Sequence, residues 1–142
     1  MKKIEIGIQR IVVKNLFILI YYLKKIKQGK IETIFDIACG NGLVLLSFVK
    51  NKNFKKVLGI DISQKVIEMA KQNDTEKQVE WKVADIFQED LEKFDLVLAL
   101  DIVEHIDDKK FLEKIKNNGK YFIFKVPIEE NFLNTFLKKN FF

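Results

Sequence analysis

Apolar runs separated by segments of helical spacing are the main pattern along this chain. The runs predict five strands, over residues 33–38, 56–62, 79–84, 94–100 and 120–126. Between them, apolar residues at helical spacing predict helices over residues 43–50, 64–72 and 109–116. Strands that alternate with helices in this way indicate an α/β fold with a doubly wound parallel sheet, for which we expect the strand order 3-2-1-4-5.

The first 30 residues differ from the rest in both pattern and charge. Apolar residues recur at roughly helical spacing over residues 4–28, which predicts one or two helices. Residues 1–30 carry eight lysine or arginine residues against the single acid Glu5. We interpret residues 1–30 as an N-terminal amphipathic helical segment and residues 31–142 as the globular domain. A last helix is expected over residues 129–139.

Charge, apolar run length and cysteine content limit which binding partners and which cellular compartment we expect. A net charge of +5, concentrated at the front, leaves nucleic acid or an anionic membrane open as partners, although we favour a solvated helix face. The densest apolar run, Leu16–Leu23, is too short to span a bilayer, which needs about 20 residues, so we expect no transmembrane segment. The single cysteine, Cys39, excludes an internal disulfide and fits a reducing compartment, so we expect a cytoplasmic protein.

A glycine-containing turn follows the first strand of the domain and carries the strongest local signal for a ligand. Glycine lets the backbone approach a ligand closely, and the helix that follows points its free N–H groups at the same place. This arrangement predicts a nucleotide-type site at the carboxyl end of the strand. The dinucleotide fingerprint needs a further glycine where this chain has Leu45, which argues against NAD, and the Gly-Lys-Ser/Thr ending of a phosphate-binding loop is absent. The residues of the turn and strand concerned are Asp36, Ala38, Cys39, Gly40, Asn41 and Gly42.

Acidic residues close two further strands at the same predicted edge. Asp61 lies about 20 residues after the turn, where a doubly wound fold places the acid that binds a ribose diol, and Ile62 follows it. The alternative for Asp61 is a helix cap, but Ser63 can cap the following helix by itself. Asp85 and Ile86 follow the strand over residues 79–84, where a loop acid is the alternative interpretation.

These segments together resemble class I S-adenosylmethionine-dependent methyltransferases. The glycine turn is similar to the family's first motif, acid-x-Gly-x-Gly-x-Gly, with Ala38 in place of the first glycine. The segment 94–106 resembles its fourth-strand motif, in the ubiquinone-type and small-molecule subgroup that reads Glu104-His105 after the strand. The resemblance covers residues of about 31–130 and implies a Rossmann-like sheet with S-adenosylmethionine as cofactor.

The resemblance also implies roles for individual residues. Asp85 would meet the adenine amino group, Ile86 would pack on the adenine ring, and the Leu100 backbone would touch the methionine part of the cofactor. His105, the only histidine, is the candidate general base, because its unperturbed pKa of about 6.5 suits neutral pH. A structural role for His105 remains an alternative. A third interpretation is that His105 forms a metal site with Asp101 and Glu104, because similar acid-x-x-Glu-His patterns bind a divalent metal in some methyltransferases. We assign no metal ligand.

We therefore expect a methyltransferase that acts on a hydroxyl or an amine of a small-molecule acceptor. We expect the fold to lack the C-terminal two-strand hairpin of full family members, which would leave the strand over residues 120–126 as an edge. A second copy of the chain or a partner chain could cover that edge. The alternative function is therefore a non-catalytic or partner-dependent S-adenosylmethionine-binding module, and a nicotinamide oxidoreductase is a more distant one.

Overall fold

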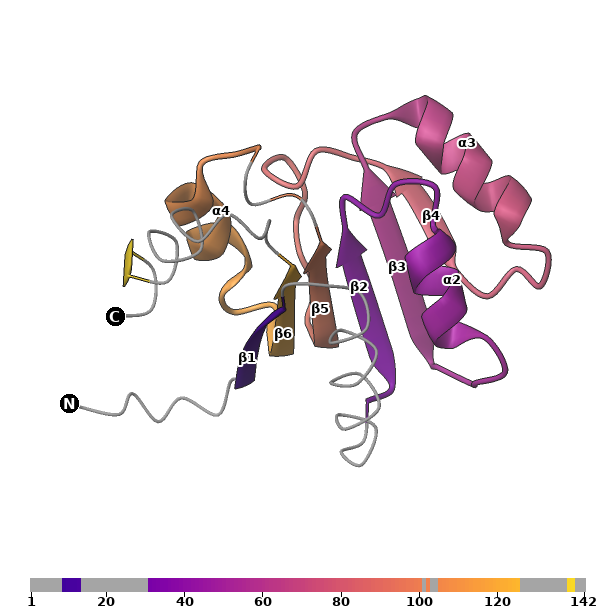
Figure 1. Cartoon of the computed structure of the whole chain (residues 1–142), viewed down its shortest axis with the longest axis horizontal. Coiled ribbons are helices and arrows are strands. Elements are labelled where there is room, and N and C mark those ends of the chain that lie inside the picture. Colours follow the sequence, from indigo (N-terminus) through magenta and orange to yellow (C-terminus); the bar gives the residue numbers. More distant parts are fainter. Residues whose placement is uncertain (1–8, 14–30, 101, 103–104, 126–137, 140–142) are drawn as a thin grey trace.

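The computed structural model describes residues 9–13, 31–100, 102, 105–125 and 138–139 (Figure 1). Within them lies a sheet of six strands in the order β1-β6-β5-β2-β3-β4, in which all neighbouring strands are parallel. The elements in chain order are β1 (Gln9–Val13), β2 (Thr33–Ile37), α2 (Leu43–Val49), β3 (Lys56–Asp61), α3 (Gln64–Asn73), β4 (Glu80–Val83), β5 (Phe94–Leu100), α4 (Asp108–Ile115) and β6 (Gly119–Lys125).

The five strands predicted for the domain are all present, and their order is the predicted one. Read from the β4 edge, the order β4-β3-β2-β5-β6 is the doubly wound order 3-2-1-4-5. The direction of winding reverses between β2 and β5. The register Ile37↔Ile60 and Ile37↔Ala99 brings the carboxyl ends of β3, β2 and β5 to one edge of the sheet. In sheets of this kind ligands bind in the crevice at that reversal.

The N-terminal strand β1 corrects the sequence analysis. Residues 9–13 were expected to be helical, but they form a strand parallel to β6, in the register Gln9↔Tyr121 to Val13↔Lys125. Ile11, Val12 and Val13 are β-branched, and such residues favour a strand where a sheet edge is available. The expectation that residues 120–126 form an exposed edge is therefore also wrong for this sheet. The remainder of the predicted N-terminal helix, and the predicted last helix apart from residues 138–139, lie outside the described residues.

The side chains of the sheet divide into two buried layers. Phe35 and Ile37 pack with Phe111 and Ile115 of α4 on one face. Ile34, by contrast, packs with Leu45, Phe48 and Val49 of α2 on the other face. Figure 1 shows α2 and α3 beside β3 and β4, with α4 towards β6. Because β2, β3, β5 and β6 are buried between these two layers, a ligand can reach them only at their ends and connecting turns, whereas the edge strand β4 is mostly exposed.

Side-chain caps mark where α3 and α4 begin. The Ser63 hydroxyl accepts a hydrogen bond from the Val66 N–H at 3.4 Å, at the start of α3. The Asp107 carboxylate accepts one from the Lys110 N–H at 3.0 Å, at the start of α4. In the part of the chain that the structure describes, no helix is both long and apolar enough to cross a membrane.

Candidate functional site

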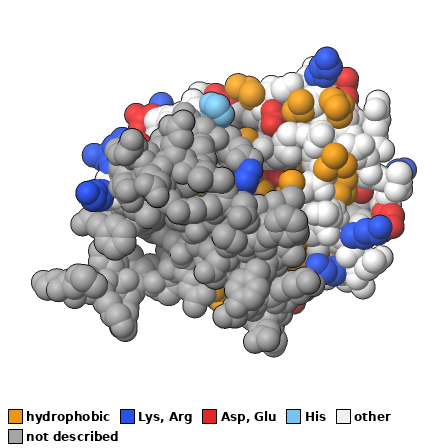
Figure 2. Space-filling view, in the orientation of Figure 1, with side chains coloured by type: hydrophobic (Ala, Val, Ile, Leu, Met, Phe, Trp, Pro, Cys, Tyr) orange, Lys and Arg blue, Asp and Glu red, His pale blue; other side chains and the backbone are white. Residues whose placement is uncertain are grey.

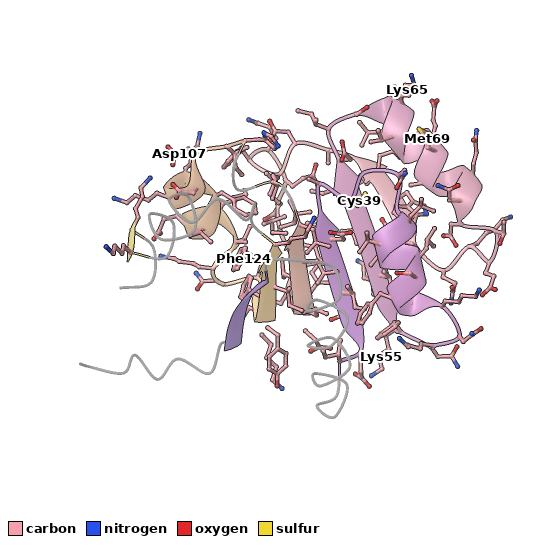
Figure 3. The ribbon with its side chains drawn as sticks, in the orientation of Figure 1. Cys39, Lys55, Lys65, Met69, Asp107 and Phe124 are labelled. Atoms are coloured by element: carbon pink, nitrogen blue, oxygen red, sulfur yellow. The ribbon has the colours of Figure 1, made fainter. Side chains whose placement is uncertain are left out.

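The glycine turn between β2 and α2 has an unusual backbone. Ala38, Gly40 and Gly42 all have left-handed φ angles, of 58°, 58° and 76°. A side chain makes this conformation unfavourable by about 1 kcal/mol, which explains why the family motif has glycine where this chain has Ala38. The Cys39 N–H donates to the Ile60 carbonyl at 2.9 Å, so the turn is attached to the end of β3. Figure 3 shows Cys39 at the end of β2, at the opposite end of the sheet from Lys55.

The two glycines of the turn, Gly40 and Gly42, have different surroundings. A Cβ built on Gly40 would meet no atom within 4 Å, so this glycine faces open space. A Cβ on Gly42 would lie 2.4 Å from the Trp81 ring, so this glycine faces packed protein. With respect to the residues that the structure describes, a ligand can therefore approach the backbone of the turn on the Gly40 side and not on the Gly42 side.

Asp61 joins the end of β3 to the turn. One carboxylate oxygen accepts a hydrogen bond from the Gly40 N–H at 3.0 Å, and the other accepts one from the Ser63 N–H at 2.9 Å. The Ser63 side chain caps α3 by itself, as expected, so the Asp61 carboxylate is not needed as the cap. Next to Asp61, the Ile62 side chain is 74% exposed, which is unusual for isoleucine.

Asp36 lies in β2 beneath the turn and is almost completely buried. Its Oδ1 atom has no hydrogen-bond partner among the described residues. Burial, and secondarily the negative charge of Asp61, raise the pKa of the Asp36 carboxyl to about 8. A buried carboxyl with an unpaired oxygen is costly unless a cationic or donor ligand approaches it. Asp36 therefore fits a site for a positively charged ligand.

Cys39 is the central residue of the turn but is unsuited to act as a nucleophile. Burial, together with the charges of Asp36 and Asp61, raises the pKa of its thiol far above the usual range. The thiolate is the reactive form of cysteine, so this thiol is unreactive at neutral pH. The neighbouring residue Asn41 has a structural role, because its backbone carbonyl accepts a hydrogen bond from the Asn73 side chain of α3 at 3.0 Å.

The ends of β4 and β5 bring the remaining predicted residues to the same edge. The Ala84 N–H donates to the Asp61 carbonyl at 2.9 Å, which holds the residues after β4 beside the end of β3. Asp85 is half-buried and accepts a hydrogen bond from the Phe87 N–H at 3.0 Å. Ile86 is only 6% exposed and packs in the core on the α4 face. Leu100 ends β5 and is half-buried on the α2 face.

The predicted catalytic segment after β5 is only partly described. His105 is exposed, and its backbone N–H donates a hydrogen bond to the Ile102 carbonyl at 2.9 Å. Asp101 and Glu104, its partners in the hypothetical metal site, lie outside the described residues. Among the residues that are described, no three His, Cys, Asp or Glu side chains are grouped so that they could hold a metal ion.

The edge of the sheet combines negative charge with exposed apolar surface. Asp36, Asp61 and Asp85 all lie at or near the carboxyl ends of β2, β3 and β4. Figure 2 shows apolar side chains exposed on the α3 side of the molecule. The large apolar side chains exposed among the described residues are Leu43, Ile62, Met69 and Val83. Carboxylates suit ribose hydroxyls and cationic groups, whereas exposed aliphatic side chains suit a base, so the edge fits a cationic adenosyl ligand.

Comparison with known proteins identifies the class of this fold and site. Residues 35–120 match the model of the methyltransferase domain family, so the chain belongs to this family. Its Rossmann-like sheet is that of class I S-adenosylmethionine-dependent methyltransferases, and S-adenosylmethionine is the cofactor of the domain. The expected membership of the class I S-adenosylmethionine-dependent methyltransferases and the expected cofactor are confirmed.

Individual relatives include ubiquinone biosynthesis O-methyltransferases. The protein of that name from Pelagibacter ubique is 39% identical over 98 residues, which cover 63% of this chain and 40% of the relative. The one from Coxiella burnetii is 30% identical over 112 residues, which cover 70% and 47%. The chain thus spans less than half the length of these two relatives.

Solved structures share the fold. A putative S-adenosylmethionine-dependent methyltransferase from Listeria monocytogenes is 28% identical with a TM-score of 0.61, covering 73% of this chain and 52% of that one. PKMT2 from Rickettsia typhi, in complex with AdoHcy, is 27% identical with a TM-score of 0.56, covering 61% and 18%.

Proposed function

We propose that this chain binds S-adenosylmethionine at the glycine turn and transfers its methyl group to a hydroxyl or amine of a small-molecule acceptor. The observation that carries the proposal is the Asp61 carboxylate. It bridges the turn at Gly40 and the start of α3 at Ser63, at the edge where the winding of the sheet reverses. A half-buried carboxylate in this position is placed to accept both hydroxyl protons of a ribose.

The other predicted residues surround the same position. Asp85 would meet the adenine amino group. Ile62, which is far more exposed than Ile86, offers the larger apolar surface to the adenine ring. The Gly40 turn and the Leu100 backbone would hold the methionine part. A cationic ligand beside the buried Asp36 carboxyl would favour its ionised form, which would then offset the positive charge. When bound, S-adenosylmethionine supplies a methyl group that is electrophilic because its sulfur is positively charged.

A hydroxyl acceptor is favoured by the names of the curated relatives, which are O-methyltransferases. A hydroxyl or amine acceptor must lose a proton as the methyl group arrives, and His105 is the proposed base. Most of the rate would come from holding the acceptor in line with the methyl group. We also propose a cytoplasmic location. The proposed methyltransferase domain spans residues 31–142, and residues 9–13 of the N-terminal segment join its sheet as β1.

The first test is calorimetric titration of the purified chain with S-adenosylhomocysteine and, separately, with NAD. We expect saturable binding of S-adenosylhomocysteine and none of NAD, because the glycine that the dinucleotide turn requires is replaced by Leu45. Binding of NAD alone would contradict the proposal and favour an oxidoreductase. Binding of S-adenosylhomocysteine without methyl transfer to any compound in a panel of hydroxylated and amine metabolites would favour the non-catalytic module.

The second test concerns the proposed base. Replacing His105 with glutamine should lower methyl transfer at least about 100-fold, since general base catalysis contributes roughly 100- to 10,000-fold. The affinity for S-adenosylhomocysteine should stay within twofold, because His105 would act on the acceptor. The rate is measured as methyl transfer from radiolabelled S-adenosylmethionine, and the affinity is measured by calorimetry. An unchanged transfer rate would leave His105 with a structural role.

A further inference from the structure

Trp81 in β4 is a residue for which the sequence analysis proposed no role, yet it contacts the glycine turn. The register pairs Trp81 with Gly59 of β3, and Gly59 with Asp36 of β2, so the three residues form one row across the sheet. Side chains in register on neighbouring parallel strands project from the same face. Trp81 packs with the core on the α2 face, the face over which the turn enters its helix.

The Trp81 ring occupies the space that two glycines leave empty. A Cβ on Gly59 would lie 2.8 Å from two atoms of the ring and 3.2 Å from the Cys39 sulfur. A Cβ on Gly42 would lie 2.4 Å from the end of the ring and 3.1 Å from the Ala70 Cβ. The ring therefore lies over β3 and reaches the last residue of the turn. Gly59 has no positive φ angle, so packing against Trp81 and Cys39 is the reason that it lacks a side chain.

A buried acid holds the indole in this orientation. The indole N–H donates to the Asp74 Oδ2 at 3.0 Å. Asp74 is 6% exposed and also accepts hydrogen bonds from the N–H groups of Gln78 and Val79, both at 3.0 Å. The orientation of the ring is thus set by the connection between α3 and β4, not by the turn that it contacts.

We propose that Trp81 is a positioning residue of the cofactor site, which holds the glycine turn in its binding conformation by filling the space beside Gly42 and Gly59. The proposal rests on the proposed function, because it assumes that the turn binds S-adenosylmethionine. Trp81 would not touch the cofactor. It would act through Gly42 and Cys39, which pack against the ring and against the Gly59 position.

A double-mutant cycle tests this role. Gly59→Ala should weaken S-adenosylhomocysteine binding at least tenfold, because the new Cβ displaces the ring and with it the turn. Trp81→Leu should also weaken binding about tenfold. The double variant should bind as well as Trp81→Leu alone, because leucine lacks the ring atoms that the new Cβ would meet. Effects that multiply in the double variant, or single effects within twofold of the unaltered protein, would overturn the proposal.

Two further measurements separate positioning from general destabilisation. Phe111→Leu removes part of a fully buried aromatic side chain on the opposite, α4 face, so it disturbs the core more than Trp81→Leu without touching the turn. It should lower the thermal unfolding midpoint while leaving the affinity within twofold. Trp81 is the only tryptophan, so the emission of the ligand-free protein reports the surroundings of this ring; Gly59→Ala should shift that emission, and an unchanged spectrum would show that the new Cβ does not displace the ring and would overturn the role.

The outcomes remain distinguishable from failure of the proposed function. Absence of binding to the unaltered protein would refute the cofactor site itself, and the positioning role with it. Binding to the unaltered protein, with no coupling between residues 59 and 81, would refute only the positioning role. If Gly59→Ala fails to fold, the comparison of Trp81→Leu with Phe111→Leu decides, and equal affinities of those two variants would overturn the role.

Discussion

Replacing Asp61 with alanine should lower the affinity for S-adenosylhomocysteine at least about 100-fold. The carboxylate is proposed to accept two hydroxyl protons of the ribose, and hydrogen bonds to a charged group contribute about 1.5–3 kcal/mol each. The loss of two such bonds, at about 1.4 kcal/mol per tenfold change, gives the expected factor. The change also removes the acceptor of the Gly40 N–H, so the turn itself would be held less firmly. Calorimetric titration measures the affinity directly.

Asp95→Ala is the matched control for Asp61→Ala. Asp95 opens β5 at the opposite end of the sheet, and its carboxylate also accepts two backbone hydrogen bonds, from the N–H groups of Glu32 and Thr33 at 2.8 and 3.0 Å. Its loss should destabilise the fold while the affinity of the remaining folded protein stays within twofold. Equal losses of affinity in the two variants would attribute the Asp61 effect to folding and would contradict the proposed ribose contact.

The second large effect concerns the stability of the ligand-free protein. The pKa of the Asp36 carboxyl is raised from its ordinary value of 3.8 to about 8 in the folded protein. Between these values the folded state holds a proton that the unfolded state releases. Asp36 therefore makes the folded protein progressively less stable as the pH rises from about 4 to about 8, and its contribution is constant outside that window.

Asp36→Asn should remove this pH dependence. At about 1.4 kcal/mol per pKa unit, the free energy of unfolding of the unaltered protein should fall by roughly 4 kcal/mol relative to that of the variant between pH 5 and pH 8. Urea denaturation of both proteins at these two pH values measures the difference. Contributions from groups that titrate equally in both proteins cancel in this comparison. Asp61 is the charged group that acts on Asp36, and it remains in the variant. Parallel stability profiles would show that Asp36 is ionised in the folded protein.

Local sequence signals were sufficient for much of the fold. The apolar runs that became β2, β3, β5 and β6 are buried on both faces, so their composition alone distinguishes them from surface segments. The caps Ser63 and Asp107 act within a few residues of themselves, and such contacts do not depend on the rest of the chain. The position of the glycine turn was equally clear, because left-handed residues favour glycine wherever they occur.

Residues 9–13 show where local pattern was insufficient. Their spacing suits a helix, but their β-branched side chains also suit a strand, and the pairing that decided between them is with β6, more than 100 residues later in the chain. A periodicity within one segment carries no information about which distant edge is available. The expected exposed edge was wrong for the same reason.

The sequence by itself determined the class of the fold, the place of the cofactor turn and the acids at the strand ends, because each depends on a residue type at a fixed offset from a strand. The tertiary structure alone decided that Asp36 is buried without a partner for Oδ1, and that Asp61 reaches back to Gly40. It also decided that Trp81 fills the space of two glycines. These properties belong to contacts between β2, β3 and β4, and such contacts exist only after strands distant in sequence are aligned in register.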